Sequence, residues 1–481
     1  MDYSQFLAMK QEIALLAVFL IVFLYDTFAP KKCLGYLSGI TTVLFAAVTV
    51  YGFTLCGGNA ELSFSGMYEN SSIITCIKNI LNVGALIVLI QASKWNNSDE
   101  QKVRRGEFYE LLLVTLFGMY LMISARHFLL FIIGLECASL PLAAMVAFEK
   151  NKYESHEAAI KYILTAVFSS AILMMGLSFV YLLSGTLYFS GIATAVALGG
   201  TSVMLIVALA FVIAGVGFKL SLVPFHLWTA DVYQGAPTSV TSYLSVISKG
   251  SAAFAFMVIL AQCFGAAYSA VWEWMLYGLI VLTITVGNLF ALRQSNMKRF
   301  LAFSSVSQAG YIMLGIVGNN AMGSAALMYY ILVYIFSNLA AFGVIQAIEN
   351  KTGKLDMNDY KGLYKSNPHL SFAMMLAMFS LAGIPPFAGF FSKFFIFTGA
   401  LSGTTSIALY VLVLIALINT IISLYYYLKV VKAMFLSQDE PVIEPFKSAF
   451  SERFALWVTV GGIIALGIVS CFYNSILTLW M

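Results

Sequence analysis

The sequence has few charged residues. Only 10% of its 481 residues are Asp, Glu, Lys or Arg, and 61% are hydrophobic, whereas a soluble domain carries nearer ~25% charge. The mean hydropathy is +0.90, which leaves too little polar surface to cover a water-soluble globule. This composition excludes a soluble fold and indicates an integral membrane protein. The net charge of +4 is small for this length and does not suggest a nucleic-acid partner.

Cysteine, histidine and proline are also scarce. The six cysteines lie far apart with no C-x-x-C pair, which argues against a zinc knuckle, an iron–sulfur site or a disulfide scaffold. The four histidines are scattered, and nine prolines leave little room for disordered linkers. We therefore expect no metal and no redox cofactor in this chain.

Long apolar runs dominate what is present. A helix needs roughly 20 apolar residues to cross a bilayer core, and about fourteen such runs occur. They are solidly apolar rather than alternating, which excludes a β-barrel. The first run lacks a basic start and a small-residue cleavage site, so we expect a retained helix and not a signal peptide. The runs cover residues 12–29, 34–56, 70–93, 108–125, 127–147, 158–184, 203–225, 237–262, 270–292, 298–318, 323–347, 371–400, 405–435 and 454–478. The sequence thus predicts an all-α polytopic membrane protein.

Basic residues alternate from loop to loop. The loops after even-numbered runs carry almost none, with Arg126 the one clear case. Because basic loops remain in the cytoplasm, loops 94–107 and 348–370 are predicted to be cytoplasmic and both termini to lie outside. The basic residues after odd-numbered runs are Lys31, Lys32, Lys94, Lys102, Arg104, Arg105, Lys150, Lys152, Arg293, Lys298, Arg299, Lys351, Lys354, Lys361, Lys365, Lys447 and Arg453.

A few charges stand inside the apolar runs, where each costs ~2.5–3.5 kcal/mol on insertion scales. Glu136, Lys219, Lys249 and Lys393 are the main ones. We interpret Glu136 as a protonatable site or counter-ion, with a structural carboxylate at a helix end as the alternative. For each lysine, the alternative to a functional charge is a packing lysine or one that extends to the headgroups.

Prolines accompany two of these lysines. Pro224 follows Lys219, and Pro385 and Pro386 precede Lys393. Proline breaks a helix and frees backbone carbonyls, which survive at membrane depth only where water or protein satisfies them. We therefore expect broken helices in the seventh and twelfth runs, with these two lysines at the breaks.

The roles of three further residues have two interpretations each. Lys78 lies toward the outer end of its run and could extend to the headgroups. Lys161 lies near the cytoplasmic end of the sixth run, where it could do the same or serve proton uptake. His226, at the cytoplasmic end of the Pro224 break, could link adjacent sites because imidazole titrates near neutral pH, or it could be merely interfacial.

Buried lysines and a carboxylate can work together. Burial lowers the pKa of a lysine in general, and a nearby carboxylate raises it again. Weakening such a pair releases a proton, and restoring the pair takes one up. A row of such lysines joined by water would conduct protons.

The two lysine-and-proline runs also suggest an internal repeat. They are the seventh and the twelfth runs, five positions apart, so they cross the membrane in opposite directions, as in inverted-repeat transporters. We predict three N-terminal helices in 1–105, a first five-helix unit in 106–265, a second in 266–436, and a cytoplasmic loop with the last helix in 437–481.

Several long motifs resemble one family. They are GLECASLPL, HEAAIKYILTAVFSSA, GFKLSLVPFHLWTADVYQGAPTSVTSYLSVISK, MKRFLAFSSVSQAGYIMLG, LAGIPPFAGFFSKF and LYYYLKVVKAMF. In this order, from about residue 105 to about 435, they resemble the antiporter-like subunits of respiratory complex I, most closely subunit N of bacterial NADH-quinone oxidoreductase. The resemblance implies fourteen spanning helices, two inverted five-helix units and a proton pathway along the membrane plane.

The resemblance also assigns residues. It implies that Glu136 is the glutamate of helix five, Lys161 the lysine of helix six, Lys219 the central lysine of broken helix seven, Lys249 the lysine of helix eight and Lys393 the lysine of broken helix twelve.

Two positions compare the chain with its relatives. Subunit M and antiporter relatives typically carry glutamate where this chain has Lys393, and subunit L is much longer. Gln308 stands where many relatives have histidine, and glutamine can order water but cannot titrate.

We therefore expect a proton-translocating membrane subunit of a complex I-type NADH-quinone oxidoreductase in a bacterial inner membrane. The resemblance implies that NAD(H), flavin, iron–sulfur clusters and quinone belong to other subunits. It also implies that a neighbouring antiporter-like subunit and small membrane subunits are the partners. The alternative is a subunit of a multisubunit Na⁺/H⁺ antiporter or membrane-bound hydrogenase, which Lys393 disfavours. A membrane scaffold without transport is a third possibility, against which the buried lysines argue.

Overall fold

The computed structural model describes residues 3–30, 33–58, 60–98, 101, 104–267, 271–403, 406–437, 440–469 and 471–481. Three basic loop residues of the topology prediction, Lys31, Lys32 and Lys102, lie outside the described residues. The chain divides into two compact units. Unit 1 comprises Met1–Leu220 and Ile247–Met275, and unit 2 comprises Ser221–Val246 and Leu276–Met481.

Unit 1 is built from helices and one small hairpin. Its elements are η1 (Tyr3–Ala8), α1 (Lys10–Phe28), η2 (Leu34–Tyr36), α2 (Leu37–Thr54), β1 (Glu61–Ser63), β2 (Tyr68–Asn70), α3 (Ser72–Asn96), α4 (Arg105–Ser124), α5 (Phe128–Val146), α6 (Tyr153–Ser184), α7 (Phe189–Gly199), α8 (Val203–Leu220), α11 (Lys249–Phe264) and η5 (Gly265–Ala267).

Glycines bring two helices of unit 1 close together. A Cβ atom on Gly118 of α4 would lie 2.4 Å from the backbone nitrogen of Ala138, and one on Gly134 of α5 would lie 2.6 Å from that of Met122. Small residues allow backbones to approach in this way inside membranes, where packing rather than the hydrophobic effect drives helix association. The α4–α5 pair therefore forms a tight frame for the side chains on α5.

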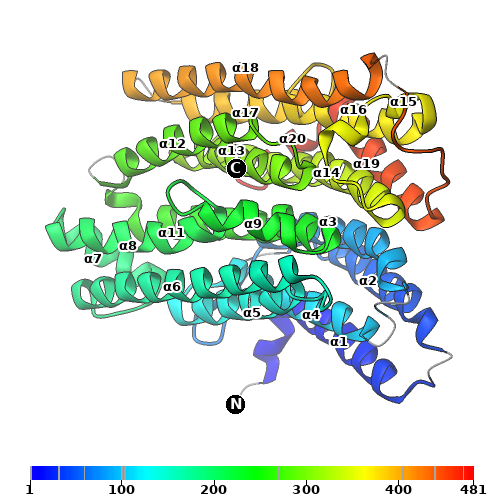
Figure 1. Cartoon of the computed structure of the whole chain (residues 1–481). Coiled ribbons are helices and arrows are strands. Elements are labelled where there is room, and N and C mark those ends of the chain that lie inside the picture. The colour runs from blue at the N-terminus through cyan, green and yellow to red at the C-terminus, as the bar shows by residue number, and fades with distance from the viewer. Residues whose placement is uncertain are drawn as a thin grey trace. The chain divides into compact units, whose positions relative to one another are not determined.

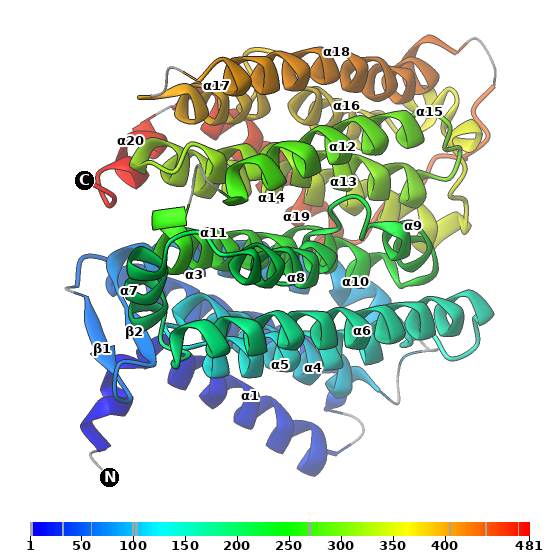
Figure 2. The same ribbon diagram turned by 90° about the vertical axis from the view of Figure 1, so that its left-hand side faces the viewer.

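The β1–β2 hairpin is a feature that the sequence did not predict. Its strands are antiparallel, with Ser63 opposite Tyr68 and Glu61 opposite Asn70, and it lies beside η1 (Figure 2). The turn passes through Phe64, Ser65 and Gly66, all with positive φ. A strand of three residues is too short to show the alternation of apolar and polar residues that predicts a strand from sequence.

Unit 2 holds most of the second half of the chain. Its elements are α9 (Leu227–Gly235), α10 (Thr238–Tyr243), the π-helical turn η4 (Leu244–Ser248), most of α12 (Glu273–Ala291), α13 (Met297–Val317), α14 (Ala321–Thr352), η7 (Met357–Tyr360), α15 (Leu363–Ser366), α16 (Pro368–Ala382), α17 (Ala388–Leu401), α18 (Ile407–Leu436), α19 (Phe450–Ile468) and α20 (Cys471–Leu477). The last residues of η4 belong to unit 1.

Helix α14 is the core of unit 2. It packs against α13, α16, α17 and α19, and 89% of its most apolar window is buried. By contrast, only 33% of the corresponding window of α18 is buried, and this long orange helix runs along the edge of the unit in Figure 1. A mostly apolar helix left exposed at an edge is suited to lipid contact.

Thirteen helices within the described residues are long and apolar enough to cross a membrane. The shorter apolar helices α16 and α17, joined through residues 383–387, cover the predicted run 371–400. This confirms the predicted all-α polytopic class. The predicted last run is divided between α19 and α20, and the short helix α7 was not predicted.

Both predicted helix breaks are present. α8 ends at Leu220, and the chain is non-helical until α9 begins at Leu227, with φ of +60° at Ser221. α16 ends at Ala382, followed by Gly383 with φ of +86°. Such a left-handed residue ends a helix and favours glycine.

Candidate functional site

Lys219 lies in the last turn of α8, directly before the first break. Its side chain is 5% exposed, and Nζ donates a hydrogen bond of 2.6 Å to Ser139 Oγ on α5. The Ser139 hydroxyl in turn donates to the carbonyl of Leu135 at 2.6 Å. A buried ammonium must be hydrogen-bonded or paired to remain charged, so Ser139 is part of the Lys219 site.

Glu136 lies one helical turn before Ser139 on α5, and residues three apart share a helix face. Its carboxylate attracts the Lys219 ammonium electrostatically. Glu136 Oε1 is buried and accepts no hydrogen bond within the described part of the chain. Glu136 therefore acts on Lys219 through its charge, and one of its oxygens accepts from no donor among the described residues.

Lys249 is the first residue of α11 and is 2% exposed. It directly follows the π-helical turn at Leu244–Ser248. Such turns widen the backbone spacing by one residue and recur at functional sites. Lys219 and Lys249 are thus buried in unit 1, each at a place where regular α-helix stops.

Lys393 lies in α17, just after the second break, and is 5% exposed. Its Nζ donates to the carbonyl oxygens of Leu381 and Ala382, both at 3.0 Å. These are carbonyls that the end of α16 leaves without helical partners. The ammonium also lies 5.2 Å from the ring centre of Tyr311 on α13, within the range of a cation–π contact.

Gln308 connects Lys393 to a group of tyrosines. Its Nε2 donates to Tyr427 OH at 3.1 Å and to the Leu381 carbonyl at 3.4 Å, and its Oε1 accepts a short hydrogen bond from Tyr330 OH. Lys393 and Gln308 therefore share the Leu381 carbonyl as an acceptor.

Beside this network is a cavity of about 10 Å³, which is lined by the apolar residues Val333 and Leu381 as well as by polar ones, among them Gln308, Ser337, Ser380, Ser392 and Lys393. This is about the smallest volume that holds one water molecule. The hydroxyls of Ser337 and Ser380 are bonded to each other at 2.7 Å.

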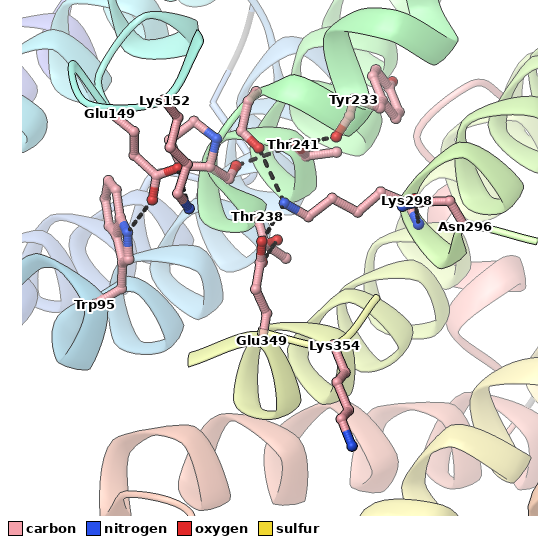
Figure 3. Close-up of polar contacts among 12 residues, drawn as sticks. Trp95, Glu149, Lys152, Tyr233, Thr238, Thr241, Asn296, Lys298, Glu349 and Lys354 are labelled. Carbon is pink, nitrogen blue, oxygen red and sulfur yellow. Dashed lines mark hydrogen bonds and ion pairs between the residues drawn. The ribbon is translucent and has the colours of Figure 1, made fainter. Parts of the chain in front are cut away.

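A buried ion pair at the start of α13 was missed at the sequence level. Lys298 Nζ lies 2.8 Å from Glu349 Oε1, with side-chain exposures of 3% and 18%. It also donates to the Ala236 carbonyl at 3.3 Å. Figure 3 shows Lys298 extending toward Glu349 and Thr238, and Thr238 Oγ1 donates a short hydrogen bond to Glu349 Oε2.

Lys298 was predicted to be a loop charge because it lies, with Arg293 and Arg299, at the junction of two apolar runs. Its partner Glu349 lies 51 residues later, and no local pattern links them. The sequence signal was limited to a basic residue at the very start of a spanning helix.

Polar side chains follow Lys298 along α13. Ser304, Gln308 and Tyr311 recur at helical spacing, and all are 2% exposed or less. Ser304 Oγ lies 2.5 Å from Tyr427 OH, and Ser305 Oγ donates to Tyr233 OH at 3.5 Å. One face of α13 thus carries a buried polar stripe within unit 2, between the Lys298–Glu349 pair and Lys393.

Two predicted residues have different surroundings. His226 is in the first break, 6% exposed, with its ring 6.2 Å from that of Phe290. The Lys161 side chain is 40% exposed and is paired with Glu157 one turn earlier at 2.7 Å. Lys161 is therefore not among the buried lysines. Within the described ranges, no three His, Cys, Asp or Glu side chains are grouped so that they could hold a metal ion.

Residues 125–423 match the family model described as NADH:quinone oxidoreductase/Mrp antiporter, transmembrane region. The chain belongs to this family. NADH-quinone oxidoreductase subunit N of Phocaeicola vulgatus is 50% identical over 98% of both chains. The same subunit of Azobacteroides pseudotrichonymphae is 49% identical over all of this chain and 98% of its own. These relatives confirm the predicted antiporter-like subunit N membership and the enzyme class.

Solved structures support the same family fold. A chain of respiratory complex I from Thermus thermophilus, solved with bound aureothin, is 29% identical with a TM-score of 0.79, covering 96% of this chain and 97% of that one. A chain of the Mrp complex from Dietzia sp. is 20% identical with a TM-score of 0.82, covering 100% and 96%. At that identity, the Mrp likeness concerns the fold alone.

Proposed function

We propose that the chain translocates protons across the membrane as a subunit of a complex I-type NADH-quinone oxidoreductase. The observation that carries this proposal is the burial of Lys219 and Lys393 at the two helix breaks. Each ammonium donates to a group that the break or a neighbouring helix provides. The subunit N relatives supply the coarser context of the enzyme.

In unit 1, Glu136 is the proposed counter-ion of Lys219. When the carboxylate is close, the ammonium form of Lys219 is favoured, and when the attraction weakens, the lysine releases its proton. The Ser139 hydroxyl, which donates to Leu135 and accepts from Lys219, orients the ammonium. Lys249, at the widened turn, is the proposed next carrier.

In unit 2, Lys393 is the proposed terminal carrier. The stripe on α13 supports a route that runs from the Lys298–Glu349 pair past Ser304 and Gln308 to Lys393. Gln308 cannot titrate, so in this route it orders hydroxyls and water rather than holding a proton. His226 and Lys161 remain predicted contributors, as a link and at proton uptake.

The energy requirement is modest. Exporting one proton against 100 mV costs ~2.3 kcal/mol, and each pKa unit is worth ~1.4 kcal/mol. A change of about two units in the proton affinity of a carrier therefore spans the requirement. Changing the distance between a lysine and its carboxylate in a low-dielectric site gives changes of this size.

The setting of this function is part of the proposal. The redox groups, NAD(H), flavin, iron–sulfur clusters and quinone, belong to other subunits. The partners are a neighbouring antiporter-like subunit and small membrane subunits in a bacterial inner membrane, with both termini outside. The division into two five-helix units at 106–265 and 266–436 also stays a prediction. The Na⁺/H⁺ antiporter alternative has the fold likeness to the Mrp chain in its favour, whereas the full-length relatives favour subunit N.

The test replaces Lys393 in the assembled complex, reconstituted in vesicles. We expect Lys393→Ala to lower the number of protons pumped per electron while the complex still assembles. Lys393→Arg should not restore pumping, because a guanidinium does not deprotonate in a protein. Lys351→Ala, an exposed lysine at the end of α14, is the control. Full pumping by Lys393→Arg would leave only a fixed-charge role for this residue.

A further inference from the structure

The three N-terminal spanning helices contain a buried ion pair that the proposed route does not use. Lys78 Nζ on α3 lies 2.6 Å from Glu12 Oε1 on α1, and both side chains are 1% exposed. The position of Lys78 in the sequence suggested that its side chain could extend to the headgroups. Its burial shows that it does not. The partner lies 66 residues away along the chain. Both residues lie outside the segment that matches the family model.

The groups around the pair can hold a positive charge without Glu12. Lys78 Nζ donates to Tyr68 OH at 3.3 Å. It also lies 5.4 Å and 5.5 Å from the ring centres of Tyr68 and Tyr120, so two aromatic faces attract the ammonium. Arg126 repels it, but Arg126 is itself paired with Glu69 on the hairpin at 2.6 Å.

Polar side chains continue from the pair in both directions. Toward the hairpin, Thr75 Oγ1 donates to Asn70 Oδ1 at 3.2 Å. Alongside the pair, Gln11 Nε2 donates to Asn79 Oδ1 at 2.9 Å. The thiol of Cys56 is a further titratable group near the column, and it accepts from Asn79 Nδ2 at 3.3 Å.

Further along α3, Asn82 accepts a short hydrogen bond from Tyr120 OH. Asn82 is ten residues past the start of α3, which corresponds to ~15 Å of helix. The buried polar side chains thus form a column that begins under the β1–β2 hairpin and extends well into the span. Ionisable residues inside a membrane are costly, and they commonly mark the path of protons or ions.

We propose that the Glu12–Lys78 pair is a proton-binding site, open to the water on the hairpin side of unit 1. In the loaded state, a proton from water is bonded to a Glu12 carboxylate oxygen, and Lys78 remains an ammonium held by Tyr68 and the two rings. Unloading returns that proton to water, so the step needs no co-reactant. The proposal rests on proton translocation by the chain and adds a site in the N-terminal helices.

The competing explanation is a purely structural pair that fastens α1 to α3. The two can be separated because replacing a buried ion pair with apolar side chains of similar size is often neutral or stabilising. We therefore use the double variant Glu12→Leu with Lys78→Met. The control, Asp231→Asn with Arg299→Gln, removes an ion pair of 2.7 Å whose side chains are about one-third exposed.

The experiment measures infrared spectra of the assembled complex during a pH titration, together with protons pumped per electron. We expect a carboxylic-acid band that appears on acidification and is lost in Glu12→Gln and in the double variant, but not in the control. We also expect the double variant to assemble and to pump less. The reversed pair, Glu12→Lys with Lys78→Glu, should assemble and restore a titrating band.

The proposal is overturned if the band does not depend on Glu12, or if the double variant pumps like the parent. This failure differs from failure of the proposed function, which would show as normal pumping by Lys393→Ala whatever the infrared band does. The infrared band is measured on the assembled complex. Its loss therefore reports on proton binding and not on a failure to assemble.

Discussion

A lysine ammonium inside a membrane is stabilised by the groups that accept its hydrogen bonds. Lys219 and Lys393 have acceptors of different kinds. Lys219 donates to the hydroxyl of Ser139, which can also donate onward. Lys393 donates to two backbone carbonyls, which can only accept. Lys219 is therefore suited to pass a proton through a side chain, whereas Lys393 needs water or another movable group for the same step.

Removing the charge of Glu136 tests its role as counter-ion. Glu136→Gln keeps the size of the side chain but no longer attracts the ammonium of Lys219. We expect fewer protons pumped per electron in reconstituted vesicles, with normal assembly of the complex. Glu154→Gln, an exposed acid in the first turn of α6, is the control. Unchanged stoichiometry would leave Glu136 with a structural role only.

Replacing Gln308 tests the network around Lys393. Gln308→Leu removes the acceptor of the Tyr330 hydroxyl and one partner of the Tyr427 hydroxyl, which keeps Ser304. A buried hydroxyl left without a partner costs about 1–3 kcal/mol. We expect reduced pumping and a lower thermal unfolding temperature of the purified complex. Gln308→His keeps a side chain that can donate and accept hydrogen bonds, so it should preserve more pumping than Gln308→Leu. The opposite order would argue against a hydrogen-bonded relay here.

At the scale of elements, the second break depends on a close approach. A Cβ atom on Gly389 of α17 would lie 1.6 Å from the carbonyl oxygen of Ser380 on α16. Gly389 N also donates to Ser380 Oγ at 3.1 Å. The two half-helices can overlap in this way only because residue 389 has no side chain, so the geometry that presents Lys393 depends on a glycine as well as on prolines.

We expect Gly389→Ala to destabilise the protein by about 1–3 kcal/mol, the usual cost of overpacking, and to impair pumping. Gly461→Ala is the matched control, because a Cβ at that position of α19 meets nothing within 4 Å. Thermal unfolding and pumping are measured on both variants. Equal behaviour of the two would contradict the close approach.

The start of α5 should respond to pH. His127 caps this helix, its Nδ1 accepting from the backbone N–H of Leu129 at 3.0 Å, and burial lowers the pKa of His127 below its usual 6.5. Protonation converts that acceptor into a donor. The cap is therefore fully present above pH ~6.5 and is lost progressively as the pH falls through the lowered value.

Hydrogen exchange at the first amides of α5 measures this effect. We expect protection to decrease on acidification in the parent protein. His127→Asn keeps a capping oxygen and should remove the pH dependence. A parent protein whose protection is constant across this range would disprove the assignment.

At the scale of the whole molecule, the loop charges predict which side each loop faces. In a background with the native cysteines replaced, a cysteine at Lys361 should react only with reagents that enter the cytoplasm. A cysteine at Leu62, exposed on β1, should react with an impermeant reagent from outside. Labelling of intact cells and inverted vesicles gives the comparison, and the reverse pattern would invert the whole topology.

The sequence predicted the spans and breaks because both depend on local signals. Apolar length gave the helices, and the prolines near Lys219 and Lys393 gave the interruptions. The ion pairs Glu12–Lys78 and Lys298–Glu349 join residues far apart in the chain, so neither partner could be identified without coordinates. The same holds for Ser139 and Tyr427, whose residue types are too common in apolar helices to stand out.

The division of the chain into units has a consequence for biogenesis. Residues 221–246 belong to unit 2, but they are made before residues 247–275, which complete unit 1. Helix α14 of unit 2, which carries the partners of this segment, ends at Thr352, about 100 residues later. At roughly 5–20 residues per second, this segment waits on the order of 5–20 s for it. During this interval Thr238 and Ser245, both buried in the finished protein, lack the partners Glu349 and Asn338 that bond them there. We therefore expect the insertion machinery to hold this segment until synthesis has passed α14.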